Sequence, residues 1–470
     1  MDEMSDGVGT ECIETLINWF LRRHKMHNIS EIVDRIGDFC FSVESQVFEI
    51  TGVLENSNGK IRLNARVNEE IIRKVKYDNE YQIWGNVSGI DITLFGCYFA
   101  YECRHVKDTV YGTLLTVPNE IVIGRSCSGD INVVKISAAI SALNYMLPRM
   151  PFKQTITPSK KTMTIESVLS REEMAAQDKY GKVVFKAGLS YSDSWEKVEC
   201  ISVPSVEYHF SKPTSIKEAI PKIASVRNLF SFFADHYLPL ENMEFADEDT
   251  RRLESGNVLC DCCIYLNNIE NIDFPRAPFL IGTRCFAHNF DEVWNNWLQF
   301  YNENRVIPTL FYEIICNHST HINRFLNLSQ SLELYSRYYR EKSAWELAIR
   351  DKYPYRNLSL KYRIEDILLY LDGYIEIEPE KIPILAKKIS DFRNYFTHYD
   401  RTRQPEPSFY EVSSANIILR YILLVIVYKT VGIEQQYISE CRRRSEYKHL
   451  KEDISIILKE NKSLEHKDDK

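Results

Sequence analysis

The sequence lacks the features that mark membrane-spanning, collagen-like and disordered proteins. Its most apolar stretch, residues 417–431, is shorter than the roughly 20 residues needed to span a bilayer. Because Arg420 and Lys429 interrupt it, we predict a buried core helix there. Only 17 glycines and 16 prolines occur in 470 residues, too few for long low-complexity segments. A formal net charge of −8 excludes a protein that coats nucleic acid uniformly, so any nucleic-acid site must be local.

Motifs for nucleotide-driven and zinc-hydrolase chemistry are absent as well. The sequence contains no G-x4-G-K-[ST], no G-x-G-x-x-G and no H-E-x-x-H. The N-terminus, MDEMSDGVGTE, has neither the basic nor the apolar part of a secretion signal. We therefore expect a cytoplasmic protein with reduced thiols, no membrane contact and no cofactor.

Twelve cysteines lie at irregular spacings. One C-x-C-C run offers soft ligands for zinc, but it differs from the usual C-x2–4-C knuckle spacing. Ordinary buried or free thiols are the favoured interpretation. The weak metal-ligand candidates are Cys260, Cys262, Cys263 and Cys285.

The length and the hydrophobic periodicity together predict an α+β multidomain protein. The chain is about three times the common domain size of roughly 150 residues. Period-two patterns dominate its first half and helical spacing dominates its second half. We predict an antiparallel sandwich or barrel followed by an all-α bundle. The predicted segments are a helical segment at 1–38, a β-rich domain at 39–212, a mixed but mainly helical connection at 213–300, a helical domain at 301–460 and a charged tail at 461–470.

Turn signals place several strands within the β-rich region. Asn58-Gly59 is a strong hairpin dipeptide, and it precedes the alternating run Ile61 to Val67. A second hairpin is predicted at Val87-Ser88-Gly89. A helix is predicted within this region at residues 136–147.

One helix of the C-terminal part carries a candidate site. Residues 380–398 have an apolar stripe with spacings of three and four. At 100° per residue, Asp391, Asn394 and His398 fall opposite that stripe and Arg393 falls on its flank. Spacing alone favours an ordinary solvated histidine at position 398, so a functional reading needs further support.

That support comes from a resemblance to a known family. Arg393-Asn394-Tyr395-Phe396-Thr397-His398 matches the R-x4–6-H signature of HEPN nucleases. Residues 321–333 and 362–368 resemble two earlier blocks of the ApeA-type HEPN subfamily, in the same order. Residues 48–54, 83–86 and 92–97 look like the hairpins of the ApeA N-terminal domain. The resemblance covers most of the chain and is strongest at the C-terminus.

The resemblance implies an anti-phage protein that aborts infection by cutting cellular RNA, with tRNA as one candidate target. It implies a metal-independent reaction in which the neighbouring 2′-hydroxyl attacks and leaves a cyclic phosphate. The residue types suit this chemistry, because histidine exchanges protons near neutrality and arginine offers a fixed fork to phosphate oxygens. We assign His398 as general acid or base, Arg393 as the phosphate clamp and Asn394 as an orienting donor.

Further residues are supporting candidates. Tyr395 and Thr397 lie within the motif, and Asp391 lies two residues before it. Glu333, where the family carries an acidic residue, is expected either to tune Arg393 or to form a plain structural ion pair with it. Basic residues could track an RNA backbone, although a solvated, charge-balanced helix face is the favoured reading. These basic candidates are Arg401, Arg403, Arg442, Arg443 and Arg444.

Partners follow from the same reasoning. Arg393 and His398 lie about 140° apart on the helix, so a second copy of the chain is expected to complete a composite site in a homodimer or higher oligomer. We expect RNA as the substrate and a phage component as the trigger, sensed by the N-terminal region. The chief alternative is a non-catalytic HEPN module that binds RNA, a nucleotide or a protein.

Overall fold

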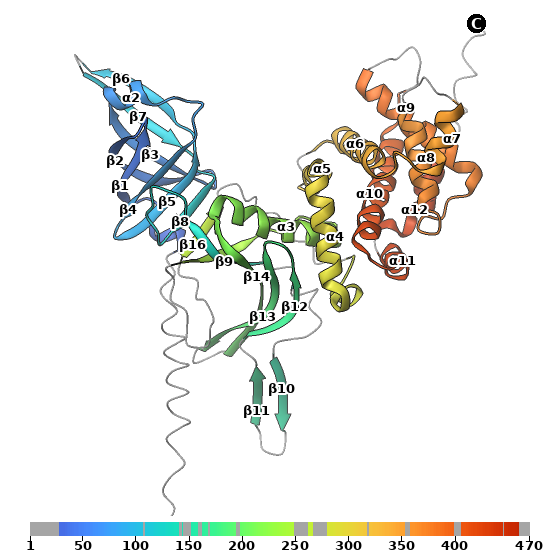
Figure 1. The fold of residues 1–470 in the computed structure, drawn as a ribbon, viewed down its shortest axis with the longest axis horizontal. Helices are drawn as coiled ribbons and strands as arrows, with labels where there is room; N and C mark the ends of the chain where they lie inside the picture. The colour runs from blue at the N-terminus through green and yellow to red at the C-terminus, as the bar shows by residue number, and fades with distance from the viewer. Residues whose placement is uncertain are drawn as a thin grey trace, which may run out of the picture.

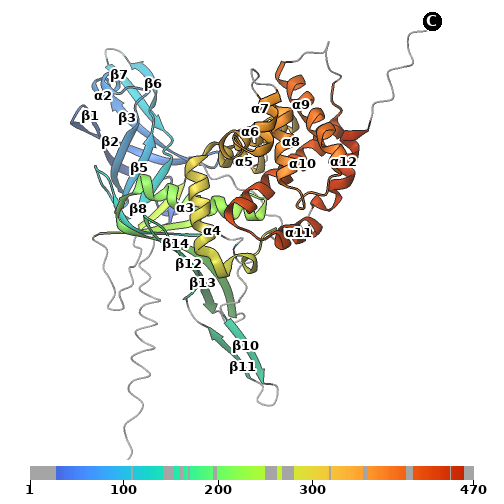
Figure 2. The ribbon, with the colours of Figure 1, turned by 45° about the vertical axis from the view of Figure 1, so that its right-hand side comes forward.

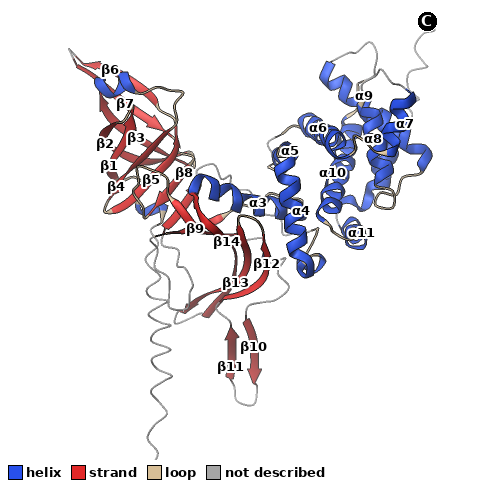
Figure 3. Cartoon of the chain, viewed as in Figure 1, coloured by secondary structure: helices blue, strands red, loops and turns tan. Residues whose placement is uncertain are grey.

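The computed structural model describes most of the chain, and everything below refers to those residues. They are 28–106, 109–140, 143, 152–157, 162–167, 170–193, 198–248, 262–266, 280–316, 319–352, 358–398, 406–444 and 446–459. A β-rich N-terminal half is followed by a helical C-terminal half (Figure 1, Figure 3). The predicted α+β architecture is thus confirmed.

The strands of the N-terminal half join in one antiparallel sheet. Its first part comprises β1 (Ile36–Val43), β2 (Gln46–Ser57), β3 (Lys60–Asn68), β4 (Tyr81–Val87), β5 (Ile90–Cys97), β6 (Ala100–Val106), β7 (Thr109–Thr116), β8 (Glu120–Ile123) and β16 (Cys262–Leu266). Its second part comprises β9 (Asn132–Ala139), β12 (Ser170–Gln177), β13 (Gly181–Asp193), β14 (Val198–Ser215) and β15 (Glu241–Asp247). The order is β12-β13-β14-β9-β15-β16-β8-β5-β4-β1-β2-β3-β7-β6, and β10 (Phe152–Thr157) pairs with β11 (Thr162–Ser167) in a separate hairpin.

Two of the hairpins form where the turn residues predicted them. Asn58 and Gly59 both have positive φ, 54° and 80°, between β2 and β3. Ser88 and Gly89, with φ of 54° and 88°, connect β4 to β5. Two consecutive positive φ values match the right-handed twist of the flanking strands, which is why Asn-Gly favours such turns.

The sheet encloses two hydrophobic cores that meet along β8. Strands β1 to β5 curl around the first core together with helix α2 (Glu69–Lys74), as the blue strands in Figure 1 show. Because side chains alternate along a strand, Ile121 and Ile123 of β8 enter this first core while Val122 between them enters the second. Strand β8 therefore contributes side chains to both cores.

The second core runs without a break from the sheet into the helical half. Helix α3 (Ile216–Ala234) packs against β9 and β14, and α4 (Phe290–Glu303) packs against β12 and also against α10 (Phe409–Val431). The other helices are α5 (Val306–Ile315), α6 (His321–Tyr339), α7 (Ala344–Lys352), α8 (Leu360–Tyr370), α9 (Ile382–His398), α11 (Gln435–Arg444) and α12 (Leu450–Leu458). Figure 2 shows α3 and α4 between the sheet and the bundle.

Helix α10 forms the centre of the bundle. It begins with a capping box made by Ser408 and Glu411 and ends at Gly432 in the left-handed conformation. In the described part of the chain it is the one helix that is long and apolar enough to cross a membrane, yet 72% of its most apolar segment is buried inside the protein. The predicted core helix at 417–431 is confirmed by this burial.

Some local predictions differ from the structure. Residues 132–139 form strand β9, so the helix predicted from residue 136 is wrong at its start. The central position of β9 explains this, because Val133 and Ile136 are buried between α3 and neighbouring strands and short buried strands lack a clear alternation. Strand β1 begins at Ile36, within the segment predicted as helical, whereas residues 1–27 lie outside the described residues.

A buried charge cluster stabilises the second part of the sheet. The carboxylate of Glu207 on β14 lies 2.8 Å from Nζ of Lys186, 3.2 Å from Nζ of Lys135 and 2.7 Å from Nε2 of His209. Burial alone would raise the pKa of Glu207, but His209 and the two lysines lower it well below its ordinary value. Glu207 is therefore charged in the folded sheet.

Candidate active site

Helix α9 presents its motif residues at the edge of the bundle. Its buried face carries Leu385, Ile389 and Phe392, which pack against the core as the apolar stripe predicted. His398 is the last residue of the helix; it is exposed and makes no hydrogen bond or ion pair with any described residue. The imidazole is therefore free to meet a ligand.

Arg393 is held by an acidic residue from another helix. Its Nη2 lies 3.6 Å from Oε2 of Glu333 on α6, and its side chain is 34% exposed. The other carboxylate oxygen of Glu333 accepts a hydrogen bond of 2.7 Å from Nη2 of Arg337, one turn further along α6. One carboxylate thus lies between two guanidinium groups, and it restricts both of them at the surface.

The remaining motif residues divide between the surface and the core. Asn394 and Asp391 are half-buried. The hydroxyl of Thr397 donates a 2.7 Å hydrogen bond to the carbonyl oxygen of Arg393, so it is used within the helix. Tyr395 is only 3% exposed and its ring contacts that of Phe396. Arg393 and His398 are therefore accessible, as is half-buried Asp391 just before them.

More arginines surround this pair than the motif suggests. Arg363 on α8 is buried and donates to Oγ of Ser336 and to the carbonyl oxygen of Leu358, both at 3.3 Å. Burial lowers the pKa of Arg363, and the positive charge of nearby Arg337 lowers it further. The guanidinium groups of Arg337, Arg363 and Arg393 thus lie around the carboxylate of Glu333.

Arg337 is the residue that sequence reasoning missed. The signal was present as a Glu333-to-Arg337 pair at i, i+4, a spacing that brings opposite charges together on a helix. That spacing alone could not show that Arg393 of another helix shares the same carboxylate. Tertiary packing of α6 against α9 supplies this information.

The tentative RNA-binding arginines do not join the site. Arg442 forms an ion pair with Glu376, whose other oxygen lies 2.8 Å from Nζ of Lys451, so this helix face is charge-balanced. Arg443 is exposed. Arg401 and Arg403 lie outside the described residues, as does the side chain of Arg444.

The cysteines predicted as weak metal ligands point in different directions. Cys260 lies outside the described residues. Cys262 belongs to the second core, whereas Cys263, its neighbour on β16, packs against the first. Burial raises the pKa of Cys263 to about 11 and also raises the pKa of Cys285. Within the described ranges, no three His, Cys, Asp or Glu side chains gather closely enough to hold a metal ion.

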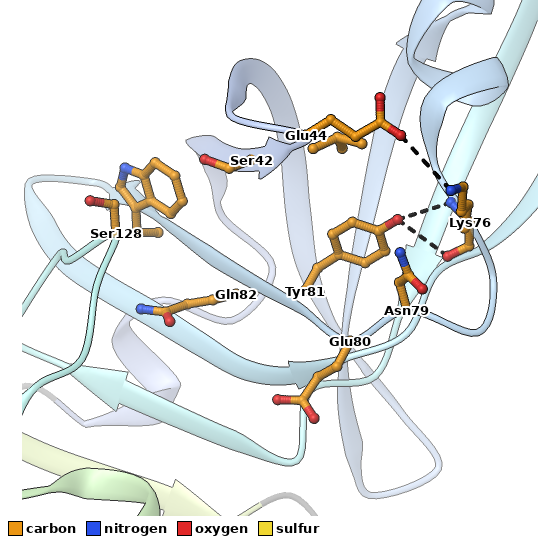
Figure 4. A pocket seen from close by; sticks show the side chains of 10 residues that line it. Ser42, Glu44, Lys76, Asn79, Glu80, Tyr81, Gln82 and Ser128 are labelled. Atoms are coloured by element: carbon orange, nitrogen blue, oxygen red, sulfur yellow. Dashed lines mark hydrogen bonds and ion pairs between the residues drawn. The ribbon is translucent and has the colours of Figure 1, made fainter.

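A shallow hollow of about 270 Å³ lies on the first part of the sheet, far along the chain from the motif. Figure 4 shows Tyr81 pointing toward Lys76, which also pairs with Glu44 at 3.8 Å. Gln82 on its floor donates to the carbonyl oxygens of Cys127 and Gly129, both at 2.9 Å. These polar groups are already engaged, so the hollow offers little to a ligand.

Comparison with known proteins identifies both halves. The family model for Apea-like HEPN matches residues 326–437, a range that contains Glu333, Arg337, Arg393 and His398. The model for ApeA N-terminal domain 1 matches residues 35–297, more than half of the chain. The chain belongs to the ApeA family. This membership makes residues 326–437 a HEPN domain and points to a role in anti-phage defence.

Other comparisons add nothing to this assignment. No curated protein matches the sequence. Among solved structures, the PlzA protein of Borreliella burgdorferi in complex with c-di-GMP aligns with 45% of this chain and 96% of its own, at 8% identity and a TM-score of 0.13. That TM-score is too low to indicate a shared fold.

Proposed function

We propose that the chain is an anti-phage effector whose HEPN domain is a metal-independent endoribonuclease acting on cellular RNA. The observation that carries this proposal is the pairing of Arg393 with Glu333 at the bundle edge, on the helix that ends in the free imidazole of His398. An imidazole can transfer protons near neutral pH, and a restricted guanidinium can stabilise charge on a phosphate. Such a site suits phosphodiester cleavage.

The proposed reaction uses a nucleophile that the RNA itself supplies. The 2′-hydroxyl attacks the adjacent phosphorus and loses its proton, the bond from phosphorus to the 5′-oxygen breaks, and that oxygen takes up a proton. The products are a 2′,3′-cyclic phosphate and a 5′-hydroxyl. His398 transfers one of the protons, and Arg393 binds the phosphate oxygens as negative charge develops. Asn394 orients the imidazole, and Glu333 positions Arg393 without touching RNA.

Cleavage of this kind needs both a base and an acid, and the motif has one histidine. Arg393 and His398 are five residues apart, which separates them by about 140° around the helix and about 7.5 Å along it. A second copy of the chain would bring another Arg393 and His398 to the same phosphate. We therefore propose a homodimer with a composite site. The N-terminal sheet would hold this site inactive until a phage component binds.

The direct test replaces His398 with alanine. His398→Ala should abolish RNA cleavage and growth arrest while the oligomer and the melting temperature stay unchanged, because this side chain is exposed and forms no hydrogen bond or ion pair with a described residue. The matched control is His288→Ala, which removes another exposed imidazole of the same chain and should leave cleavage intact. Sequencing of RNA ends would identify the cut site, and a chelator should have no effect on the rate.

Two results would contradict the proposal. Growth arrest that survives His398→Ala would favour a non-catalytic HEPN module that acts by binding. Loss of cleavage on adding a chelator, with restoration by a divalent cation, would instead require a metal-dependent nuclease.

A further inference from the structure

A rigid hairpin tip lies where the sheet meets the helices. The turn between β12 and β13 is fixed by Asp178, whose carboxylate accepts hydrogen bonds from the backbone N–H groups of Tyr180 and Gly181 at 2.7 and 3.1 Å. The same carboxylate accepts from the hydroxyl of Tyr208 at 2.6 Å and from Nε1 of Trp294 on α4 at 2.9 Å. The tip is thereby held against both β14 and α4. In Figures 1 and 2, β12 lies beside α4.

Lysines surround the ring of Tyr180 at this tip. Tyr180 is 40% exposed. Nζ of Lys222, from α3, lies 3.3 Å from the ring centroid, and Nζ of Lys179 lies 4.7 Å from it. Two ammonium groups from separate elements thus share one aromatic side chain, which stabilises each cation by its π-electrons.

Further positive charge lies nearby. The N–H of Ser211 donates to the carbonyl oxygen of Tyr180 at 2.8 Å, which places exposed Lys212 beside the tip on β14. Burial lowers the pKa of Lys222; Tyr180 and the Asp178 carboxylate oppose this shift, whereas the charges of Lys179 and of Arg305, at the junction of α4 and α5, add to it. We call Lys179, Tyr180, Lys212, Lys222 and Arg305 the Tyr180 cluster.

The cations of this cluster form no ion pair in the part of the chain that the structure describes, although the negative charge of the buried Asp178 carboxylate acts on Lys222. No carboxylate forms an ion pair with Lys179, Lys212, Lys222 or Arg305, whereas many other basic side chains do so, such as Arg62 with Glu55. Glu218, one turn before Lys222 on α3, is exposed and unpaired with it. Asp178 is buried and saturated with hydrogen bonds. On a chain of net charge −8, such a group is a local excess of positive charge.

We propose that the Tyr180 cluster binds the phosphate groups of single-stranded RNA, as a second contact for the substrate of the HEPN domain. The proposal rests on the proposed nuclease function for its choice of ligand. A backbone of regularly spaced phosphates matches several unpaired cations on neighbouring elements better than one small anion does. When phosphates attract the two lysines away from the ring, the exposed face of Tyr180 becomes available to stack on a base.

The test measures RNA binding separately from cleavage. In the His398→Ala background, the double variant Lys222→Gln and Arg305→Gln is titrated with a fluorescent single-stranded oligoribonucleotide at several salt concentrations. Each phosphate contact on a single strand contributes a slope of about 0.7 in log K against log salt, so loss of two should reduce the slope by about 1.4 and weaken binding roughly tenfold near 0.15 M salt. The matched control, Lys60→Gln, removes an exposed lysine of the β2–β3 turn and should change neither quantity.

The outcomes separate this proposal from the nuclease assignment. Neither Lys222 nor Arg305 forms an ion pair within the described residues. The double variant loses the cation–π contact of Lys222 with the exposed ring of Tyr180, so its melting temperature should stay close to that of the parent chain. An unchanged slope and affinity in a folded double variant would overturn the RNA contact, even if wild-type protein cleaves RNA. If the double variant loses affinity for ATP but binds RNA as the parent chain does, the RNA contact is overturned in favour of a small phosphorylated ligand. If the double variant loses affinity for RNA, the RNA contact is supported even if the wild type cleaves no RNA.

Discussion

Asp235 connects the sheet-covering helix to the centre of the HEPN bundle, and replacing it should destabilise their junction. It caps α3 with φ of 52° and is 8% exposed. Its carboxylate accepts a 2.7 Å hydrogen bond from Nε of Arg420 on α10 and another from the hydroxyl of Tyr447, and its carbonyl oxygen accepts from Nη2 of Arg420 at 2.7 Å. A single residue thus contacts three segments of the chain.

The expected magnitude follows from these contacts. Removing one partner of a buried ion pair costs about 3–5 kcal/mol, because the other charge stays behind without compensation. Arg420 is 25% exposed, so solvent can reach it and the lower part of this range applies. Asp235→Ala also places alanine in the left-handed region, which destabilises the folded state by about 1 kcal/mol more. Asp235→Gly removes the side chain without that strain, so it should be about 1 kcal/mol more stable than Asp235→Ala.

Urea unfolding followed by circular dichroism measures these differences. The matched control is Asp34→Ala, because Asp34 is exposed, has φ of 58° and makes no side-chain hydrogen bond in the described structure. The free energy of unfolding of Asp34→Ala should fall by only about 1 kcal/mol, the cost of placing alanine in the left-handed region. If Asp235→Ala proved no less stable than Asp34→Ala, the junction would not depend on this carboxylate and the reasoning would be refuted.

Three further predictions address the site and the sheet. Glu333→Gln should slow RNA cleavage about tenfold, which corresponds to about 1.4 kcal/mol of activation free energy. The Kd for RNA in the His398→Ala background should stay within a factor of two. An unchanged rate would show that Glu333 forms only a structural ion pair with Arg393. Mixing wild-type subunits with an equal amount of His398→Ala subunits should leave about a quarter of the cleavage of the same amount of wild-type protein, because only dimers of two wild-type chains keep both histidines at the phosphate. About half of the wild-type cleavage after verified subunit exchange would contradict a site that needs both chains. Because the pKa of Glu207 is lowered in the folded state, its contribution to stability is present above about pH 4.5 and is lost as the pH falls. Thermal scans should therefore show that the melting temperature of Glu207→Gln falls less toward acid pH than that of the wild type.

Local patterns predicted the elements of this protein better than their assembly. The apolar stripe of α9 and the Asn-Gly turn depend on neighbours within a few residues, and both are observed. The insertion of β15 and β16 between β9 and β8 depends on pairing across more than a hundred residues, which no local pattern encodes. For the same reason the motif indicated Arg393 and His398, but only packing of α6 on α9 brings Arg337 to the same carboxylate.

Control of the HEPN site by the N-terminal region, as proposed, requires a physical connection between them, and the continuous second core supplies one. Helix α3 packs on β9 and β14 and contacts α10 through Asp235 and through the Tyr428 hydroxyl, which donates to the carbonyl oxygen of Phe232 at 2.7 Å. Helix α10 in turn packs against α6, which carries Glu333. Because a close-packed core transmits displacement instead of absorbing it, a shift of α3 on the sheet would move the carboxylate that restricts Arg393. Two flexibly tethered domains would have no such route, so the proposed control requires the sheet and the bundle to share a core.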